Sequence, residues 1–168
     1  MHGGGRRFDP GILHFWLQGV FAGERTVIFR RILIAVDGTE ASARGVEVGS
    51  QLALRYDAEL VLVTAVSVPE FVAKAAGADG GGLEDYIEWM GQEALGSALD
   101  ILRRDGIGAE VKVLIGPPAE TIVVEAGHPG VDLVVMGRRS RTEPKDLVLG
   151  SVSDRVARNI AVPILLVP

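Results

Sequence analysis

The 168-residue chain contains no cysteine, which excludes disulfide bridges, a thiolate nucleophile and cysteine-ligated metal sites. Aromatic residues make up only 5% of the chain, so its core must be built from aliphatic side chains. Basic residues are not in excess: the net charge is −5, which argues against binding to a nucleic-acid backbone. The hydrophobic share of 48% is typical of a soluble globular protein, and the length fits one domain.

Several functional signatures are missing as well. No P-loop of the form GxxxxGK followed by serine or threonine occurs, and no GxGxxG follows the first apolar run. A GxSxG nucleophile elbow is also missing. The three histidines, His2, His14 and His128, are far apart in the sequence and do not indicate a zinc site. P-loop nucleotidases, GxGxxG dinucleotide enzymes and hydrolases with that elbow are therefore not indicated.

Residues 1–29 are interpreted as an N-terminal extension of a domain over residues 30–168. The apolar stretch 11–22 is too short to span a bilayer, and no clear cleavage site follows it. We therefore expect a cytoplasmic protein without a membrane segment. Two explanations stay open: the stretch docks as a short amphipathic helix on the domain or on a partner, or the natural chain begins near Val27.

From Arg30 onward, apolar runs alternate with helix-like patterns. Strands are expected over 31–37, 59–66, 109–115, 131–136 and 162–167, and helices over 40–54, 83–104, 119–127 and 150–159. A glycine-rich loop is expected over 75–82, a polar loop over 138–146, and a helix stop at Gly106. This order predicts an α/β fold with three layers and an open, mainly parallel five-stranded sheet. Ligands of such sheets bind at the carboxyl ends of strands, where the strand order reverses.

The first expected strand ends in Asp37. A carboxylate at this place could accept hydrogen bonds from a ribose hydroxyl or hold a cation. It could equally be a turn or cap residue that opens the following helix. The spacing alone does not separate these two roles.

The fourth expected strand ends at Gly137, where the lack of a Cβ lets the backbone approach a bound group. Its loop carries four cationic side chains against two carboxylates, and Gly150 and Ser151 then precede a helix. The free amides of a helix start attract phosphate, and the hydroxyls of Ser151 and Ser153 could contact the same anion. A solvated loop followed by a serine cap is the plainer interpretation.

The segment from Gly137 to Ser151 resembles the nucleotide motif of the universal stress protein family. That motif is a glycine, two residues, a second glycine, nine residues, and then glycine with serine or threonine. The chain keeps this spacing, with Ser140 in place of the second glycine. RILIAVDGTEASARGVEVGSQLA and LGSVSDRVARNIAVPILLVP resemble the family's two ends, so the likeness covers residues 30–168.

The resemblance implies a Rossmann-like, HUP-type sheet of order 3-2-1-4-5 and a site for ATP with Mg²⁺. The first part of that site lies toward the base and sugar and comprises Ala35, Val36, Asp37, Ala65, Met136 and Gly137. The second part lies toward the phosphates and comprises Arg139, Ser140, Gly150, Ser151, Val152 and Ser153. The Cβ of Ser140 could crowd the phosphates, so it is expected to weaken ATP binding without excluding it.

The last strand, 162–167, is strongly apolar and lies at an edge in this order, so the resemblance implies a homodimer that pairs through it. If the extension covers that edge instead, Phe15 and Trp16 are the expected contacts. The function expected is an ATP-binding stress-response regulator in which the nucleotide acts as a switch. The alternatives are a dimeric interaction module that binds no nucleotide, and an ATPase, which lacks an obvious general base.

Overall fold

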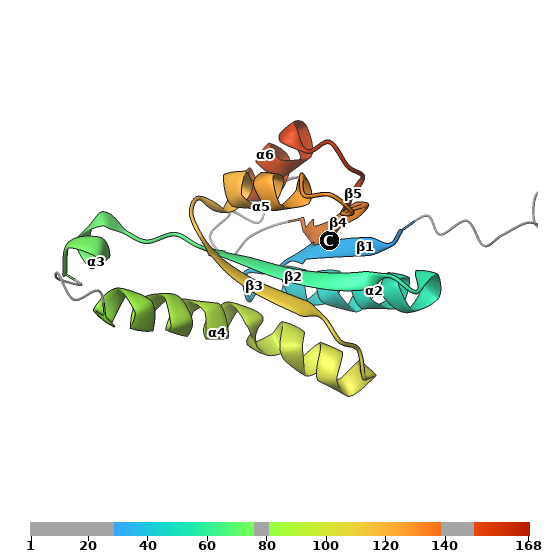
Figure 1. The fold of residues 1–168 in the computed structure, drawn as a ribbon, viewed down its shortest axis with the longest axis horizontal. Helices are drawn as coiled ribbons and strands as arrows, with labels where there is room; N and C mark the ends of the chain where they lie inside the picture. The colour runs from blue at the N-terminus through green and yellow to red at the C-terminus, as the bar shows by residue number, and fades with distance from the viewer. Residues whose placement is uncertain (1–28, 76–80, 139–149) are drawn as a thin grey trace, which may run out of the picture.

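The computed structural model describes residues 29–75, 81–138 and 150–168. Strands and helices alternate along most of the chain, as Figure 1 shows. The strands are β1 (Arg31–Ala35), β2 (Glu59–Val66), β3 (Glu110–Ile115), β4 (Leu133–Gly137) and β5 (Ile164–Val167). The helices are α2 (Glu40–Tyr56), α3 (Glu70–Ala75), α4 (Gly81–Asp105), α5 (Pro118–Ala126) and α6 (Ser151–Asn159).

The five strands form one parallel sheet in the order β3-β2-β1-β4-β5. β1 is central: its Leu33 pairs with Val61 on one side and with Val134 on the other. The predicted fold class and strand order are therefore confirmed. The strand order reverses between β1 and β4, and β3 and β5 are the two edges.

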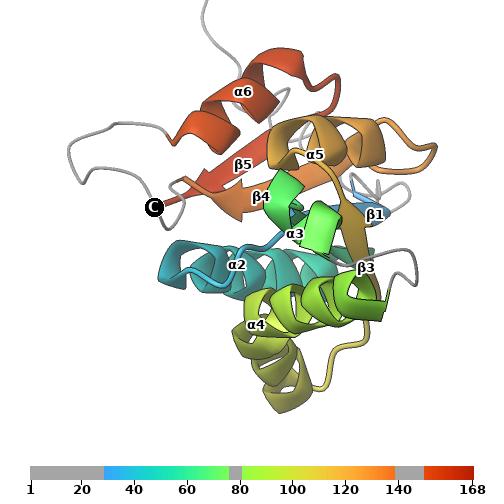
Figure 2. The same cartoon turned by 90° about the vertical axis from the view of Figure 1, so that its left-hand side faces the viewer.

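Helices cover both faces of the sheet and make three layers. α2 and α4 lie on one face, α5 and α6 on the other (Figures 1 and 2). The α2/α4 face packs around Ile34, Val46 and Leu62, and the opposite face around Val63, Val134 and Val156; all six side chains are almost completely buried. Strands covered on both faces need continuous apolar runs, which is why ELVLVTAV forms β2.

Local sequence signals begin and end the helices. Thr39 caps α2 by accepting the N–H of Ser42, and Asp57 ends that helix in the left-handed region with φ of 58°. α4 ends at Asp105 because Gly106 follows with φ of 67°, which glycine adopts without strain. The predicted stop at Gly106 is therefore confirmed.

The stretch between β2 and α4 differs from its prediction. Residues 75–82 were expected to be a loop, but α3 includes Ala75 and α4 already begins at Gly81. Residues 76–80 lie outside the described part. The remaining bounds differ from the expected ones by at most two residues, so that Val36 and Asp37 follow β1, and Val162 and Pro163 precede β5.

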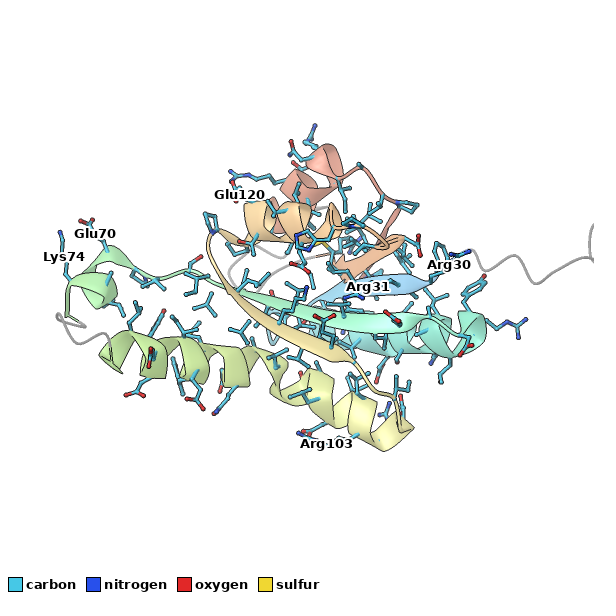
Figure 3. The ribbon with its side chains drawn as sticks, in the orientation of Figure 1. Arg30, Arg31, Glu70, Lys74, Arg103 and Glu120 are labelled. Atoms are coloured by element: carbon cyan, nitrogen blue, oxygen red, sulfur yellow. The ribbon has the colours of Figure 1, made fainter. Side chains whose placement is uncertain are left out.

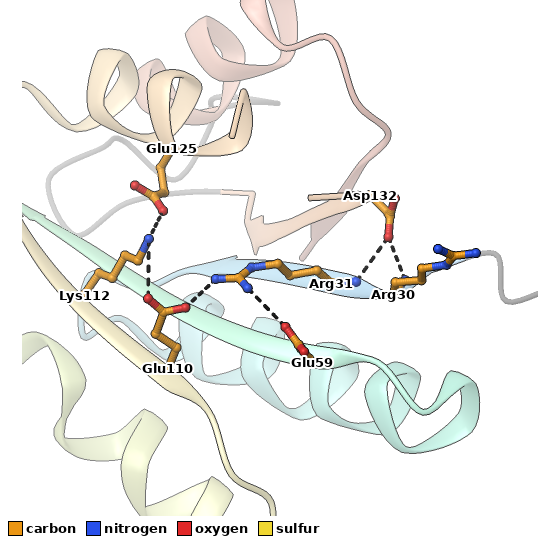
Figure 4. Close-up of polar contacts among 7 residues, drawn as sticks. All are labelled: Arg30, Arg31, Glu59, Glu110, Lys112, Glu125 and Asp132. Carbon is orange, nitrogen blue, oxygen red and sulfur yellow. Dashed lines mark hydrogen bonds and ion pairs between the residues drawn. The ribbon is translucent and has the colours of Figure 1, made fainter. Parts of the chain in front are cut away.

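Ion pairs gather at the amino-terminal edge of the sheet (Figure 4). The Arg31 guanidinium joins Glu59 on β2 (3.1 Å) and Glu110 on β3. The Asp132 carboxylate accepts the backbone N–H groups of Arg30 (2.7 Å) and Arg31 (3.1 Å). These contacts hold the start of the central strand to its neighbours on both sides.

A second charged group continues this cluster toward α5. The ammonium of Lys112 contacts the carboxylate of Glu125, which is nearly buried, and lies 3.5 Å from Glu110 (Figure 4). The hydrogen bond to Glu125 raises the pKa of Lys112 above its ordinary value of 10.5. Other charged side chains lie on the outside of the layers, such as Glu70 and Lys74 on α3, which pair at 2.7 Å (Figure 3).

Candidate functional site

A cleft of about 250 Å³ opens at the carboxyl edge of the sheet, between the ends of β1 and β4. This is the point where the strand order reverses. Nine residues predicted for the site line it: Ala35, Val36, Asp37, Ala65, Met136, Gly137, Ser151, Val152 and Ser153. Four further lining residues were not predicted: Ser42, Val63, Pro118 and Ile122.

Asp37 is exposed at the mouth of the cleft and has a structural contact as well. Its Oδ1 accepts the backbone N–H (3.1 Å) and the hydroxyl (2.6 Å) of Thr39. The Thr39 hydroxyl accepts in turn from the N–H of Ser42 (3.1 Å). Asp37 therefore supports the cap of α2, as the turn interpretation predicted. No hydrogen bond to its second oxygen, Oδ2, occurs among the described residues.

Gly137 ends β4 directly against the first turn of α2. A Cβ at this position would lie 2.9 Å from the Ala41 carbonyl carbon and 2.9 Å from the Ser42 nitrogen. Neither backbone atom can move aside without displacing the helix. The glycine is thus required by the packing of α2 on the sheet, a reason that the sequence did not indicate. The same contact draws the start of α2 to the edge of the cleft.

The start of α6 is fastened to the end of β4 through one carbonyl group. The Arg138 carbonyl accepts the N–H of Gly150 (2.9 Å) and lies 2.7 Å from the hydroxyl of Ser153. The Ser153 hydroxyl also lies 3.0 Å from the Gly150 carbonyl. Its single hydrogen is therefore used within the protein, and the predicted donation from this hydroxyl to an anion does not fit the structure. What Ser153 can still direct at a ligand is its amide.

Gly150 is the cap residue of α6 and lies next to the lining residues rather than among them. Its φ of −73° and ψ of 157° are open to any residue, so backbone strain does not require a glycine here. Glycine leaves the helix start without a side-chain cap. Arg139 and Ser140, the other two predicted phosphate contacts, lie outside the described residues.

Three helices begin around the cleft: Ser42 is in the first turn of α2, Pro118 starts α5 and Ser151 starts α6. Helix starts carry partial positive charge, so their dipoles together favour an anion here. Asp37 is the only charged side chain among the described lining residues. The missed Ser42 and Pro118 could have been found from the rule that helix starts share this edge with the strand ends.

Asp154 lies one residue beyond the lining part of α6. The hydrogen bond from Arg158 lowers the pKa of Asp154 below its ordinary value.

Within 29–75, 81–138 and 150–168, no cluster of three or more histidine and carboxylate side chains could hold a metal ion. No helix in the same ranges is long and apolar enough to cross a membrane.

An open parallel sheet with a cleft at its switch point and helix starts around the rim is the arrangement in which α/β domains commonly bind small ligands. Residues 28–168 match the pattern of the Universal stress protein family. The chain therefore belongs to the universal stress protein family.

Relatives and solved structures agree with this membership. The universal stress protein MJ0531 of Methanocaldococcus jannaschii is 31% identical over 140 residues, covering 83% of this chain and 82% of its own. Protein MJ0577 of the same organism superposes with a TM-score of 0.67 at 25% identity, covering 83% and 96%. A universal stress protein solved in complex with cAMP superposes with a TM-score of 0.63 at 26% identity, covering 84% of this chain and 98% of its own.

Proposed function

We propose that the cleft binds an adenine nucleotide, ATP in particular, and that the bound nucleotide regulates the protein. The observation that carries the proposal is the convergence of nine sequence-predicted residues from three strand ends and a helix start on one cleft. The relative solved with cAMP, an adenine nucleotide, supports the class of ligand.

The apolar half of the cleft suits the base and the sugar. Val63 and Ile122 form walls of the cleft, and Met136 is a buried neighbour from β4. Backbone at Ala65 would meet the adenine edge, and Asp37 Oδ2 would accept a ribose hydroxyl. Ligand pockets commonly measure about 300 to 1,000 Å³, so a cleft of 250 Å³ fits a nucleoside better than a complete triphosphate.

The phosphates would then extend past the start of α6. The amides of Ser151 and Val152 lie in the first turn of α6, at the positive end of the helix dipole, which favours negative charge. The amide of Gly150 donates to the Arg138 carbonyl, so Gly150 would contribute only by leaving space for the phosphates. Arg139 and Ser140 stay predicted contacts of the same group. Because Ser153 uses its hydroxyl within the protein, we assign it an amide contact only.

Mg²⁺ would accompany ATP without a dedicated protein cage. Mg²⁺ at nucleotide sites is usually held by phosphate oxygens and waters with one or two carboxylates, and Asp37 is the only carboxylate that lines the described cleft. The ion would neutralise the phosphates, and this chain's residues would bind and orient the nucleotide.

The nucleotide would regulate the protein by contacting several elements of the fold at once. It would contact the end of β1, the end of β4 and the start of α6, and β4 pairs directly with the edge strand β5. We propose that the chain forms a homodimer through β5, with Pro163 and Pro168 limiting the paired stretch. A dimeric interaction module that binds no nucleotide is the alternative, because Ser140 departs from the motif.

The experiment is a comparison of melting temperatures with and without millimolar MgATP, with MgGTP as the control. Ligand at about 100 times its Kd should stabilise the fold by about 2.7 kcal/mol, a rise of several degrees at this size. Asp37→Asn keeps an acceptor for Thr39 but turns the ribose acceptor into a donor, so the ATP-dependent rise should shrink. Asp100→Asn on α4 is the matched control. Equal shifts with ATP and GTP, or none, would reject adenine-nucleotide binding.

A further inference from the structure

The α4 side of β3 carries an apolar stripe that the helices leave uncovered. Val111, Val113 and Ile115 are 42%, 38% and 61% exposed, three of the seven large exposed hydrophobic side chains in the described ranges. They alternate with Lys112 and Leu114, which point to the α5 side. Figure 1 shows β3 as an edge strand, in front of the sheet and above α4.

A groove of about 340 Å³ lies beside this stripe, between β3 and α4. Its floor is apolar and includes Ile87, Leu95 and Val113. Gly91 lets the helix backbone come close there, since a Cβ on it would lie 3.0 Å from a methyl of Val113. Glu84 and Glu88 lie among the lining residues from α4. The result is an elongated apolar surface with acidic side chains along the helix.

The other edge of the sheet does not have such a surface. On β5, Ile164 and Leu166 pack against the α5/α6 core and Leu165 against the α2/α4 core. None of the large exposed hydrophobic residues of the described chain is on β5. Among the described residues, the exposed large hydrophobic side chains of an edge strand are therefore those of β3, whose burial would be favourable.

We propose that residues 11–22 of the same chain cover this surface as a short helix. The segment GILHFWLQGVFA is apolar apart from His14 and Gln18, which are four positions apart and would share one helical face. The adjoining face would carry an apolar stripe of Leu13, Trp16, Leu17 and Val20 at helical spacing. Arg6 and Arg7 precede the segment and complement the acidic residues Glu84 and Glu88 of the groove.

The described chain starts on the correct side of the sheet for this. Phe29 packs on the α2/α4 core and makes an edge-to-face contact with Tyr56, with ring centroids 5.3 Å apart. β1 and β3 are two strands apart, about 10 Å. The six residues 23–28 can span about 20 Å, which reaches the Val111 end of β3. A twelve-residue helix of about 18 Å would then run along the stripe toward Ile115.

A disulfide test uses the absence of native cysteine, so that any bridge joins only the two introduced residues. In the full chain, Leu17→Cys is combined with Val113→Cys. The control combines Leu17→Cys with Val124→Cys on α5, which is 67% exposed on the opposite layer. A disulfide forms only when the two Cα atoms come within about 7 Å. We expect mild oxidation to give a bridge of monomer mass in the first variant and not in the second.

The other outcomes overturn the proposal. A product of dimer mass through Val113 would mean that a second copy covers the stripe. Equal yields in both variants would indicate random collisions of a segment that does not dock, and no bridge in either would place the segment elsewhere.

Fluorescence provides a second test that needs no oxidation. The chain has two tryptophans, so Trp89→Phe on α4 leaves Trp16 as the only tryptophan, whose emission is excited selectively at wavelengths that tyrosine does not absorb. Adding Val113→Glu should expose Trp16 and remove its protection from acrylamide. Val124→Glu, the matched change of an exposed valine, should leave the protection unchanged. Protection that survives Val113→Glu, or that is missing in the Trp89→Phe chain, would contradict docking on β3.

Discussion

Two glycines at one helix–strand contact provide a sharp test of the packing around the cleft. At Gly137, a Cβ would lie 2.9 Å from two backbone atoms of α2. At Gly45, on α2 itself, a Cβ would lie 3.6 Å from the nearest atom, the nitrogen of Gly137, which is ordinary contact. The same substitution to alanine should therefore have opposite effects at the two positions.

Gly137→Ala should lower the free energy of unfolding by about 1 to 3 kcal/mol, the usual effect of overpacking. Gly45→Ala should raise it by about 0.5 to 1 kcal/mol, because alanine is the better residue inside a helix. At this chain length, each kcal/mol corresponds to roughly 2 to 4 °C in melting temperature.

Urea unfolding followed by far-UV circular dichroism measures both changes. The midpoint should fall for Gly137→Ala and rise for Gly45→Ala, with the m-value unchanged in both. Full native stability in Gly137→Ala would refute the close approach of β4 to α2. A loss in Gly45→Ala as large as in Gly137→Ala would show that the contact does not discriminate between the two positions.

Three further predictions concern the cap of α2 and the Lys112 ion pair. Thr39→Ala removes the acceptor for the Ser42 N–H and should cost about 1 kcal/mol in urea unfolding, whereas Thr39→Ser should not. Lys112→Met leaves the nearly buried Glu125 carboxylate without its ion-pair partner and should lower the free energy of unfolding by about 1 to 3 kcal/mol. The double variant Lys112→Met with Glu125→Leu should recover most of that loss. Because the pKa of Lys112 is raised in the fold, its contribution to stability is complete below pH 10.5 and should be lost as the pH rises through the pKa of the folded state. A pH series of melting temperatures, recorded for the native protein and the double variant, measures this loss.

These predictions have clear failures. Equal stability of the alanine and serine variants at position 39 would contradict a stabilising cap by the Thr39 hydroxyl. A double variant no more stable than Lys112→Met alone would mean that the buried Glu125 charge is not the cause of the loss. Parallel pH curves for native protein and the double variant would separate alkaline unfolding from Lys112.

The sheet was predictable because its strands are covered on both faces. Such strands must be continuous apolar runs, as Ile32–Ile34 and Leu60–Val63 are, and these runs stand out between polar helices. The order of the strands came from the family resemblance, since periodicity alone does not fix which strands pair. α3 was missed because its six residues, EFVAKA, are too few to establish a helical period.

The site was predictable in outline, since strand ends and helix starts of this fold meet at one edge. The contacts between the residues of the site could not be predicted from the sequence. The sequence does not reveal that the Ser153 hydroxyl is engaged by the Arg138 carbonyl, or that Gly137 is required by α2. Both depend on distances between segments far apart in the chain, which only the packed structure sets.

Nucleotide binding at the start of α6 is the central claim, and a calorimetric titration with MgATP tests it most directly. Native protein should bind ATP, and Gly150→Val should show no measurable binding, because the valine side chain blocks the helix start without straining a backbone at φ of −73°. Gly45→Ala controls for a glycine change outside the cleft lining. ATP bound equally well by native protein and a folded Gly150→Val variant would contradict the assignment of the phosphates to this helix start.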